Sequence, residues 1–69
     1  MANTKRLGNL IRTHRQMKGL KQFELAQKIG IKPSTLCRIE AGTQKPAFKT
    51  LYDIAAVLQA ELTQLLSAV

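Results

Sequence analysis

Residues 22–41, QFELAQKIGIKPSTLCRIEA, constrain the fold of this chain more than any other stretch. Apolar residues recur at helical spacing in both halves, and Gly30 between them can adopt the positive φ that ends a helix. Pro33 suits the first turn of a new helix, because its missing N–H would have no partner there. The spacing therefore predicts two short helices, over about 22–29 and 33–41, joined by a tight turn.

Two short helices joined in this way are typical of a helix-turn-helix, whose second helix lies in the DNA major groove. Leu36 and Ile39 form the apolar side of the second helix, and Gly42 is expected to end it. Five residues on or beside its opposite side are candidates for base contact: Lys32, Pro33, Ser34, Cys37 and Arg38. Arg38 is the first choice, because a guanidinium can bind guanine O6 and N7 together. Pro33 offers only an apolar contact, such as one to a thymine methyl.

Charge is distributed unevenly along the chain. Residues 1–49 hold all eleven lysines and arginines and two acids, a formal charge of +9, whereas residues 50–69 hold two acids and no base, a charge of −2; the total is +7. The basic part is suited to a polyanion such as double-stranded DNA, and the C-terminal part to another partner. A basic surface that serves only solubility is the alternative, and the helix-turn-helix pattern makes it the minor one.

Length and composition exclude other classes. Sixty-nine residues make one domain, 1–69, and 45% apolar content with three aromatics suits an all-α bundle. No apolar run approaches the roughly 20 residues of a membrane span, and no signal-peptide core is visible, so a cytoplasmic protein with no membrane contact is expected. One cysteine excludes an internal disulfide. No paired carboxylates, Cys–His arrangement or phosphate loop indicates an enzyme, and neither cofactor nor metal is expected.

Three motifs in order, GLKQFELAQKIG, IKPSTLCRIEAG and KPAFKTLYDIAAVL, resemble the helix-turn-helix family of phage repressors and Cro proteins, the XRE family. The resemblance covers about residues 7–66 and implies a compact, five-helix, lambda-repressor-like DNA-binding domain. It also implies an ion pair between Arg15 and Glu40 that fixes the angle of the second helix of the motif. If that pair is buried, losing one partner costs about 3–5 kcal/mol; an exposed pair is worth little.

Phosphate contacts are expected from residues before, within and after the second helix of the motif. Lys21 is a general attractor of phosphate, and Thr35 either contacts phosphate or caps locally. Gln22 lies at a helix N-terminus, which favours an anion. The resemblance implies a phosphate contact for Gln22, and further ones from the loop that holds Thr43 and Lys45. It adds Gln44 as a further base contact, with an ordinary solvated loop as the alternative.

Two more helices are predicted, over about 4–18 and 47–58. The buried side of the first is expected to hold Leu7, Leu10 and Ile11, with His14 as a partly buried packing residue, while Arg12, Gln16 and Lys18 face water. Phe48 is expected in the core with the apolar residues of the other helix. Three positions depart from the family pattern. Phe23 either packs beneath the first helix or lies exposed near the DNA backbone. Ala47 replaces a Ser or Thr helix cap. Gln59 replaces a glycine, so either the turn is strained or the helix runs on.

The two ends of the chain complete the prediction. Residues 1–6 are expected to be a loose basic arm that either frays or touches DNA. Residues 60–69 are expected to form a fifth helix with more apolar surface than one side of the bundle needs. They predict a homodimer interface, with core capping as the competing interpretation, from Ala60, Leu62, Leu65, Leu66 and Val69.

The sequence therefore predicts a small homodimeric repressor or controller protein that binds a palindromic operator. RNA polymerase is a further partner that such a regulator can have. The alternative is an antitoxin that binds a toxin through its apolar tail and represses its own operon. A redox role for Cys37 is the less favoured interpretation of that thiol, because the chain offers no resolving cysteine.

Overall fold

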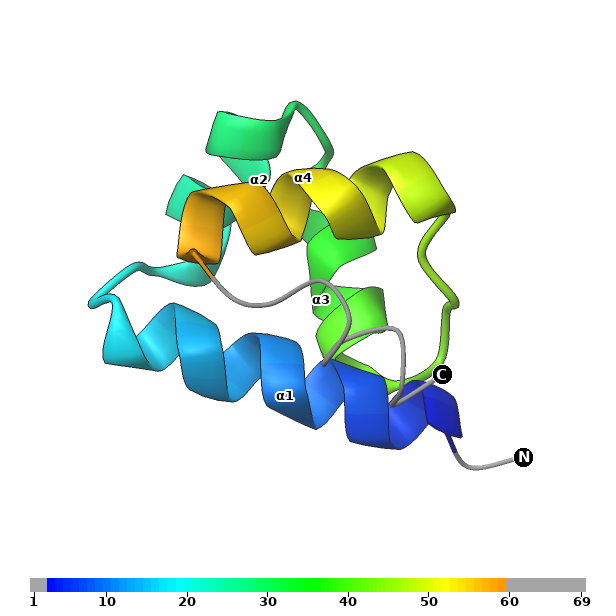
Figure 1. The fold of residues 1–69 in the computed structure, drawn as a ribbon. Coiled ribbons are helices and arrows are strands. Elements are labelled where there is room, and N and C mark those ends of the chain that lie inside the picture. The colour runs from blue at the N-terminus through cyan, green and yellow to red at the C-terminus, as the bar shows by residue number, and fades with distance from the viewer. Residues whose placement is uncertain (1–2, 60–69) are drawn as a thin grey trace.

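The computed structural model describes residues 3–59, which form four α-helices around one core (Figure 1). The helices are α1 (Asn3–Met17), α2 (Gln22–Ile29), α3 (Pro33–Ala41) and α4 (Phe48–Leu58). Across this described range no strand occurs, which confirms the all-α prediction. In Figure 1, α1 crosses the lower part of the view and α4 the upper part, with α3 visible between them. The predicted fifth helix, residues 60–69, lies outside the described residues.

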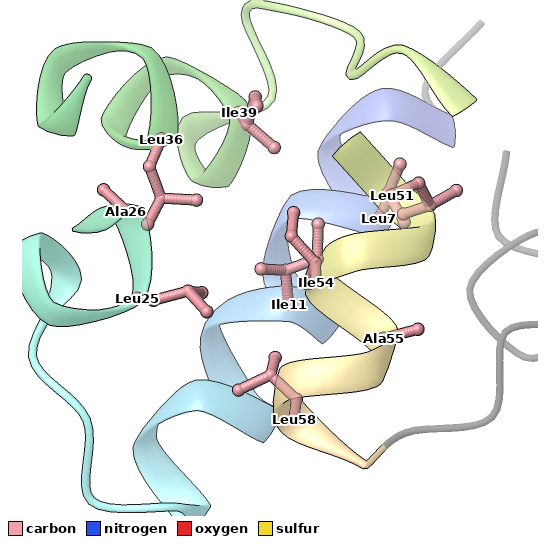
Figure 2. Close-up of a cluster of buried hydrophobic side chains, with 10 residues drawn as sticks. All are labelled: Leu7, Ile11, Leu25, Ala26, Leu36, Ile39, Leu51, Ile54, Ala55 and Leu58. Carbon is pink, nitrogen blue, oxygen red and sulfur yellow. The ribbon is translucent and has the colours of Figure 1, made fainter. Parts of the chain in front are cut away.

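The core takes one apolar stripe from each helix. Its side chains are all at most 5% exposed: Leu7, Ile11, Leu25, Ala26, Leu36, Ile39, Leu51, Ile54, Ala55 and Leu58. Figure 2 shows these side chains clustered among the four helices. Burying one Leu or Ile completely contributes about 1.5–3 kcal/mol, so this cluster is the main source of stability in a chain so short.

His14 is half-buried on the core side of α1, which confirms the prediction of a partly buried packing residue. Two sequence predictions, one about burial and one about the N-terminal arm, need correction. Phe48 is 63% exposed, since the first turn of α4 extends past the edge of the core. Residues 3–6 are not part of a loose arm, because α1 already begins at Asn3.

The turn after α3 shows how a glycine shapes the motif. Gly42 has a φ of 82°, and its N–H donates to the Ile39 carbonyl while the Thr43 N–H donates to the Arg38 carbonyl. These two bonds form a Schellman motif, which satisfies carbonyls that the helix end would otherwise leave unpaired. The same arrangement ends α2 at Gly30. Both helix ends lie where the sequence predicts them.

The two ends of α4 are capped less completely, with one bond from the Gln59 N–H to the Ala55 carbonyl at its C-terminal end. Ala47 precedes the helix and makes no side-chain cap bond. Gln59 follows it with a φ of 55°, and it is the one non-glycine residue with a positive φ among residues 3–59. Of the two alternatives for this position, the structure shows the strained turn: α4 ends at Leu58 and does not run on.

A glycine in the middle of α1 allows α1 to pack directly on α3. A Cβ atom on Gly8 would lie 2.5 Å from the Glu40 carbonyl oxygen and 2.6 Å from that of Ile39. No side chain fits there, so the backbones of the two helices approach one another at this point. The sequence analysis missed this contact, although an isolated glycine inside a helical stretch was the available signal.

Candidate nucleic-acid interface

The helix α3 has one buried and one exposed side. Leu36, Ile39 and Glu40 are buried, whereas Pro33, Ser34, Cys37 and Arg38 are all exposed. We call these four exposed residues the reading face. They come from two successive turns on one side of the helix, so a single ligand surface can contact them together. Lys32 is exposed just ahead of the face, at the N-cap position of α3.

The loop after α3 bonds back to the reading face. The Arg38 Nε–H donates to Gln44 Oε1 at 2.9 Å, so two residues that the sequence predicts as separate base readers contact each other. The Thr43 hydroxyl donates to the Arg38 carbonyl at 3.2 Å, and the Thr43 N–H donates to the same oxygen at 3.0 Å. Both donors of Thr43 therefore cap α3, and a phosphate could take the hydroxyl proton only by displacing that bond.

A buried ion pair joins α1 to α3. Arg15 Nε lies 2.7 Å from Glu40 Oε2, and Arg15 Nη2 donates to Glu40 Oε1 at 3.2 Å. Glu40 is 1% exposed and Arg15 is 9% exposed. Arg15 Nη1 also donates to the Leu20 carbonyl at 2.7 Å, which ties the turn between α1 and α2 to the same guanidinium. This bidentate geometry leaves neither charge uncompensated, which is the condition under which buried ions are tolerated.

Two further residues bind Glu40. Gln22, the first residue of α2, donates through Nε2 to Glu40 Oε1 at 3.0 Å. Arg12 donates through Nη2 to the Glu40 carbonyl at 3.3 Å, with its Nε 3.8 Å from Glu40 Oε1. We call Arg12, Arg15, Gln22 and Glu40 the Glu40 cluster. Two arginines and one carboxylate leave it one positive charge in excess.

The Glu40 cluster changes what the sequence predicts for two residues. Arg12 is exposed, as predicted, and its 44% exposed side chain also binds the end of α3. Gln22 is half-buried and already uses one amide N–H on Glu40, so at most one N–H remains for a phosphate. Neither contact follows from local spacing, because the residues that meet are 28 and 18 positions apart.

The other residues predicted to contact phosphate come from three segments: the residue before α2, the first turn of α3 and the loop after α3. The side chains of Lys21 and Lys45 are exposed, and that of Thr35 is half-buried in the first turn of α3. Lys21 precedes α2, where its backbone N–H donates to Glu24 Oε1 at 2.7 Å. Its ammonium group makes no cap bond. These two cationic groups therefore lie just before α2 and in the loop after α3, and the bond from Gln22 to Glu40 joins the start of α2 to the last turn of α3.

An apolar hollow adjoins the N-terminal end of α3. Phe23, Gln27, Ile31 and Pro33 line a volume of about 310 Å³, and Phe23 is 54% exposed. Of the two alternatives for Phe23, the structure therefore supports an exposed position and excludes packing beneath α1. Pro33 belongs both to this hollow and to the reading face.

Within residues 3–59, no group of three or more His, Cys, Asp or Glu side chains could hold a metal ion. Cys37 is an exposed free thiol on the reading face. None of the helices in the described range has the length and apolar character needed to cross a membrane. The side chains of the reading face thus offer hydrogen bonds, positive charge, apolar contact and one thiol.

Comparison with known protein families agrees with the helix-turn-helix geometry described above. A helix-turn-helix family model, HTH_3, matches residues 11–65. The ImmF control region 10 kDa protein of Bacillus phage phi105 is 40% identical over 65 residues, which cover 94% of this chain and 72% of the phage protein. The matched region includes the whole reading face and the Glu40 cluster.

Solved structures share the arrangement of helices. SinR of Bacillus subtilis, described as the master regulator for biofilm formation and solved in complex with DNA, has a TM-score of 0.81 at 36% identity, covering 87% of this chain and 97% of that chain. SinR in a complex with SinI has a TM-score of 0.82, and there this chain spans 59% of the matched chain. The restriction–modification controller protein C.AhdI of Aeromonas hydrophila has a TM-score of 0.88 at 28% identity, covering 94% and 98%.

Proposed function

This chain belongs to the XRE-type helix-turn-helix family and is a DNA-binding transcriptional regulator, and we propose that it acts as a homodimeric repressor or controller protein on a palindromic operator. In this proposal each protomer places α3 in the major groove of one half-site. The observation that carries it is the reading face, four exposed residues on a helix whose other side is fixed by the core and the Glu40 cluster.

Base recognition is assigned to the reading face, with Arg38 as its main member. An arginine bound to guanine O6 and N7 contributes about 1–3 kcal/mol of discrimination against another base. Ser34 and Cys37 contact neighbouring base edges, and Lys32 contacts DNA ahead of the helix. Pro33, with Phe23 beside it across the apolar hollow, forms an apolar contact to a thymine methyl.

Phosphates are held by residues at the start of α2, in the first turn of α3 and in the loop after α3. Lys21 and Gln22 act at the N-terminus of α2, where backbone N–H groups and the helix dipole favour an anion. Lys45 acts from the loop, and Thr35 from the first turn of α3. Thr43 contributes by capping α3, which keeps this loop close to Arg38. Arg12 joins this group, because the excess charge of the Glu40 cluster lies beside Gln22.

Dimerisation is needed because one α3 helix makes too few base contacts for useful affinity, whereas two half-sites bound together multiply it. We assign the interface to the C-terminal residues Ala60, Leu62, Leu65, Leu66 and Val69, which are apolar in a segment with no basic residue. A segment without basic residues is poorly suited to DNA and well suited to a second copy of the chain.

The test is selection of bound sequences from a randomised duplex pool, with the mass of the complex measured. We expect a palindrome whose half-site centres lie about 34 Å apart, one helical turn, bound by two chains. Arg38→Ala should then lower affinity for the selected duplex by about 1–3 kcal/mol per half-site and affinity for random duplex much less, while Arg38→Lys keeps the charge and serves as its control. Equal losses on both duplexes would remove Arg38 from base recognition.

An antitoxin is the second candidate function. It shares the reading face and differs in what residues 60–69 contact, which would be a toxin in place of a second copy. The support for a protein partner is that the similar protein SinR was solved bound to SinI. Purification from the source cell distinguishes the two, because a homodimer has twice the chain mass and an antitoxin complex carries a second, different chain.

A further inference from the structure

Arg38 is held by a loop residue before any DNA arrives. Its Nε–H donates to Gln44 Oε1 at 2.9 Å, across six positions of sequence. The Schellman motif at Gly42 turns the chain back over the last turn of α3, and Thr43 fastens that turn with two bonds to the Arg38 carbonyl. The backbone of the loop is thus fixed against the same residue whose side chain Gln44 binds.

This bond limits how Arg38 can bind a guanine. A guanidinium carries five N–H groups and can present two parallel pairs to O6 and N7: the side pair from Nε and Nη2, or the end pair from Nη1 and Nη2. The Nε–H of Arg38 is already used by Gln44. Only the end pair is therefore available for a bidentate contact while the Gln44 bond is kept.

We propose that Gln44 is a positioning residue, which holds Arg38 so that its Nη1 and Nη2 groups bind guanine O6 and N7 end-on. This assigns Gln44 a role different from the separate base contact that the sequence predicts. The inference rests on the proposed function, since it requires Arg38 to bind a guanine.

The expected gain is one of preorganisation. A free arginine side chain loses rotamer freedom when it binds, and a side chain already held in place loses less. Because the pair is exposed to water, the gain is modest, and we expect loss of the Gln44 acceptor to weaken specific binding roughly 2- to 10-fold. Gln44→Met removes the oxygen while keeping the length and the neutral charge of the side chain.

The experiment is a double-mutant cycle with wild type, Gln44→Met, Arg38→Ala and the double variant. Each is titrated against the duplex recovered from the randomised pool and against duplexes in which each half-site guanine is replaced in turn by 7-deazaguanine, which lacks N7. Gln16→Met, the same change at an exposed position of α1, is the control, and melting temperatures check the fold.

Support requires that Gln44→Met costs 2- to 10-fold on the selected duplex and nothing further in the Arg38→Ala background. Its cost should also disappear on the 7-deazaguanine duplex that Arg38→Ala identifies as its target, and the salt dependence of binding should be unchanged. A cost that persists without Arg38 would show that Gln44 contacts DNA itself, and no cost at all would show that the bond is idle; either overturns the proposal. If Arg38→Ala alone has no effect, the assignment of Arg38 in the proposed function fails instead.

Discussion

The helices α3 and α4 are of similar length, yet the chain holds them in different ways. The C-terminal end of α3 is fixed by the Gly42 turn, by the close approach of α1 at Gly8 and by the Glu40 cluster with its buried Arg15–Glu40 pair. In contrast, α4 ends at a strained Gln59, whose side chain accepts one exposed bond from Lys18, and its buried side chains are all apolar. Buried polar bonds and close backbone contacts are concentrated on α3, whose orientation determines what its exposed side can contact. Apolar packing is the main support of α4, which closes the core.

The largest effect should come from breaking the polar attachment of α3. Arg15→Met leaves the buried Glu40 carboxylate without its main partner, and we expect the free energy of unfolding to fall by about 3–5 kcal/mol. Urea unfolding of the variant and of wild type measures this difference in the free energy of unfolding. Arg12→Met is the matched control, because Arg12 is 44% exposed and should cost less than about 1 kcal/mol. Similar losses for both variants would contradict the central role of Arg15.

The next effect concerns the backbone contact of the same helix. Gly8→Ala places a Cβ 2.5 Å from the Glu40 carbonyl oxygen, so α1 and α3 must separate, and we expect a loss of about 1–3 kcal/mol. Without that overlap, the change would stabilise α1 through its better helix propensity. The exposed neighbour Asn9→Ala shows the propensity effect alone and should not lower the melting temperature. Stabilisation by Gly8→Ala would mean that the two helices can separate freely.

For α4 the expected changes are gains, because its ends are not optimised. Ala47→Ser supplies a hydroxyl that can accept a bond from an N–H of the first turn, and we expect about 1 kcal/mol of added stability. Calorimetry of the variant and wild type checks it. The control is Ala47→Val, which adds bulk without an oxygen acceptor and should give no gain.

The smallest effect is expected at the other end of α4. Gln59→Gly removes the strain of a non-glycine residue at a φ of 55°. Glycine also raises the conformational entropy of the unfolded chain, which cancels part of this stabilisation, so we expect a net gain in stability of about 0.5 kcal/mol. The change also removes the bond from Lys18 to the Gln59 side chain, which is exposed and worth little. Lys18→Met removes that bond alone and isolates its share. A loss of stability in Gln59→Gly larger than in Lys18→Met would show that the turn is not strained.

The same contrast explains which features the sequence could predict. Local rules were sufficient for α2, α3 and their glycine ends, because apolar spacing and φ preferences act within a few residues. They failed where distant residues meet, as in the contact of Arg12 with Glu40 or the closeness of Gly8 to α3. Phe48 was misplaced because spacing gives the side of a helix and not how far the core extends along it. The exposed residues of the reading face matched their expected positions, whereas the bond between Arg38 and Gln44 depends on a loop geometry that no pattern predicts.

The separation of the two sides of α3 bears on how such a chain can evolve. All the groups that set the orientation of α3 point inward or lie at its end, whereas Ser34 and Cys37 lie exposed in its first two turns. If these two residues contact bases as proposed, mutations at their positions would alter operator choice with little loss of fold, and new specificities would become accessible through single viable steps. The buried side of α3 would stay constant while its exposed side varies. Exchange of these two side chains between relatives should then transfer the preference for an operator.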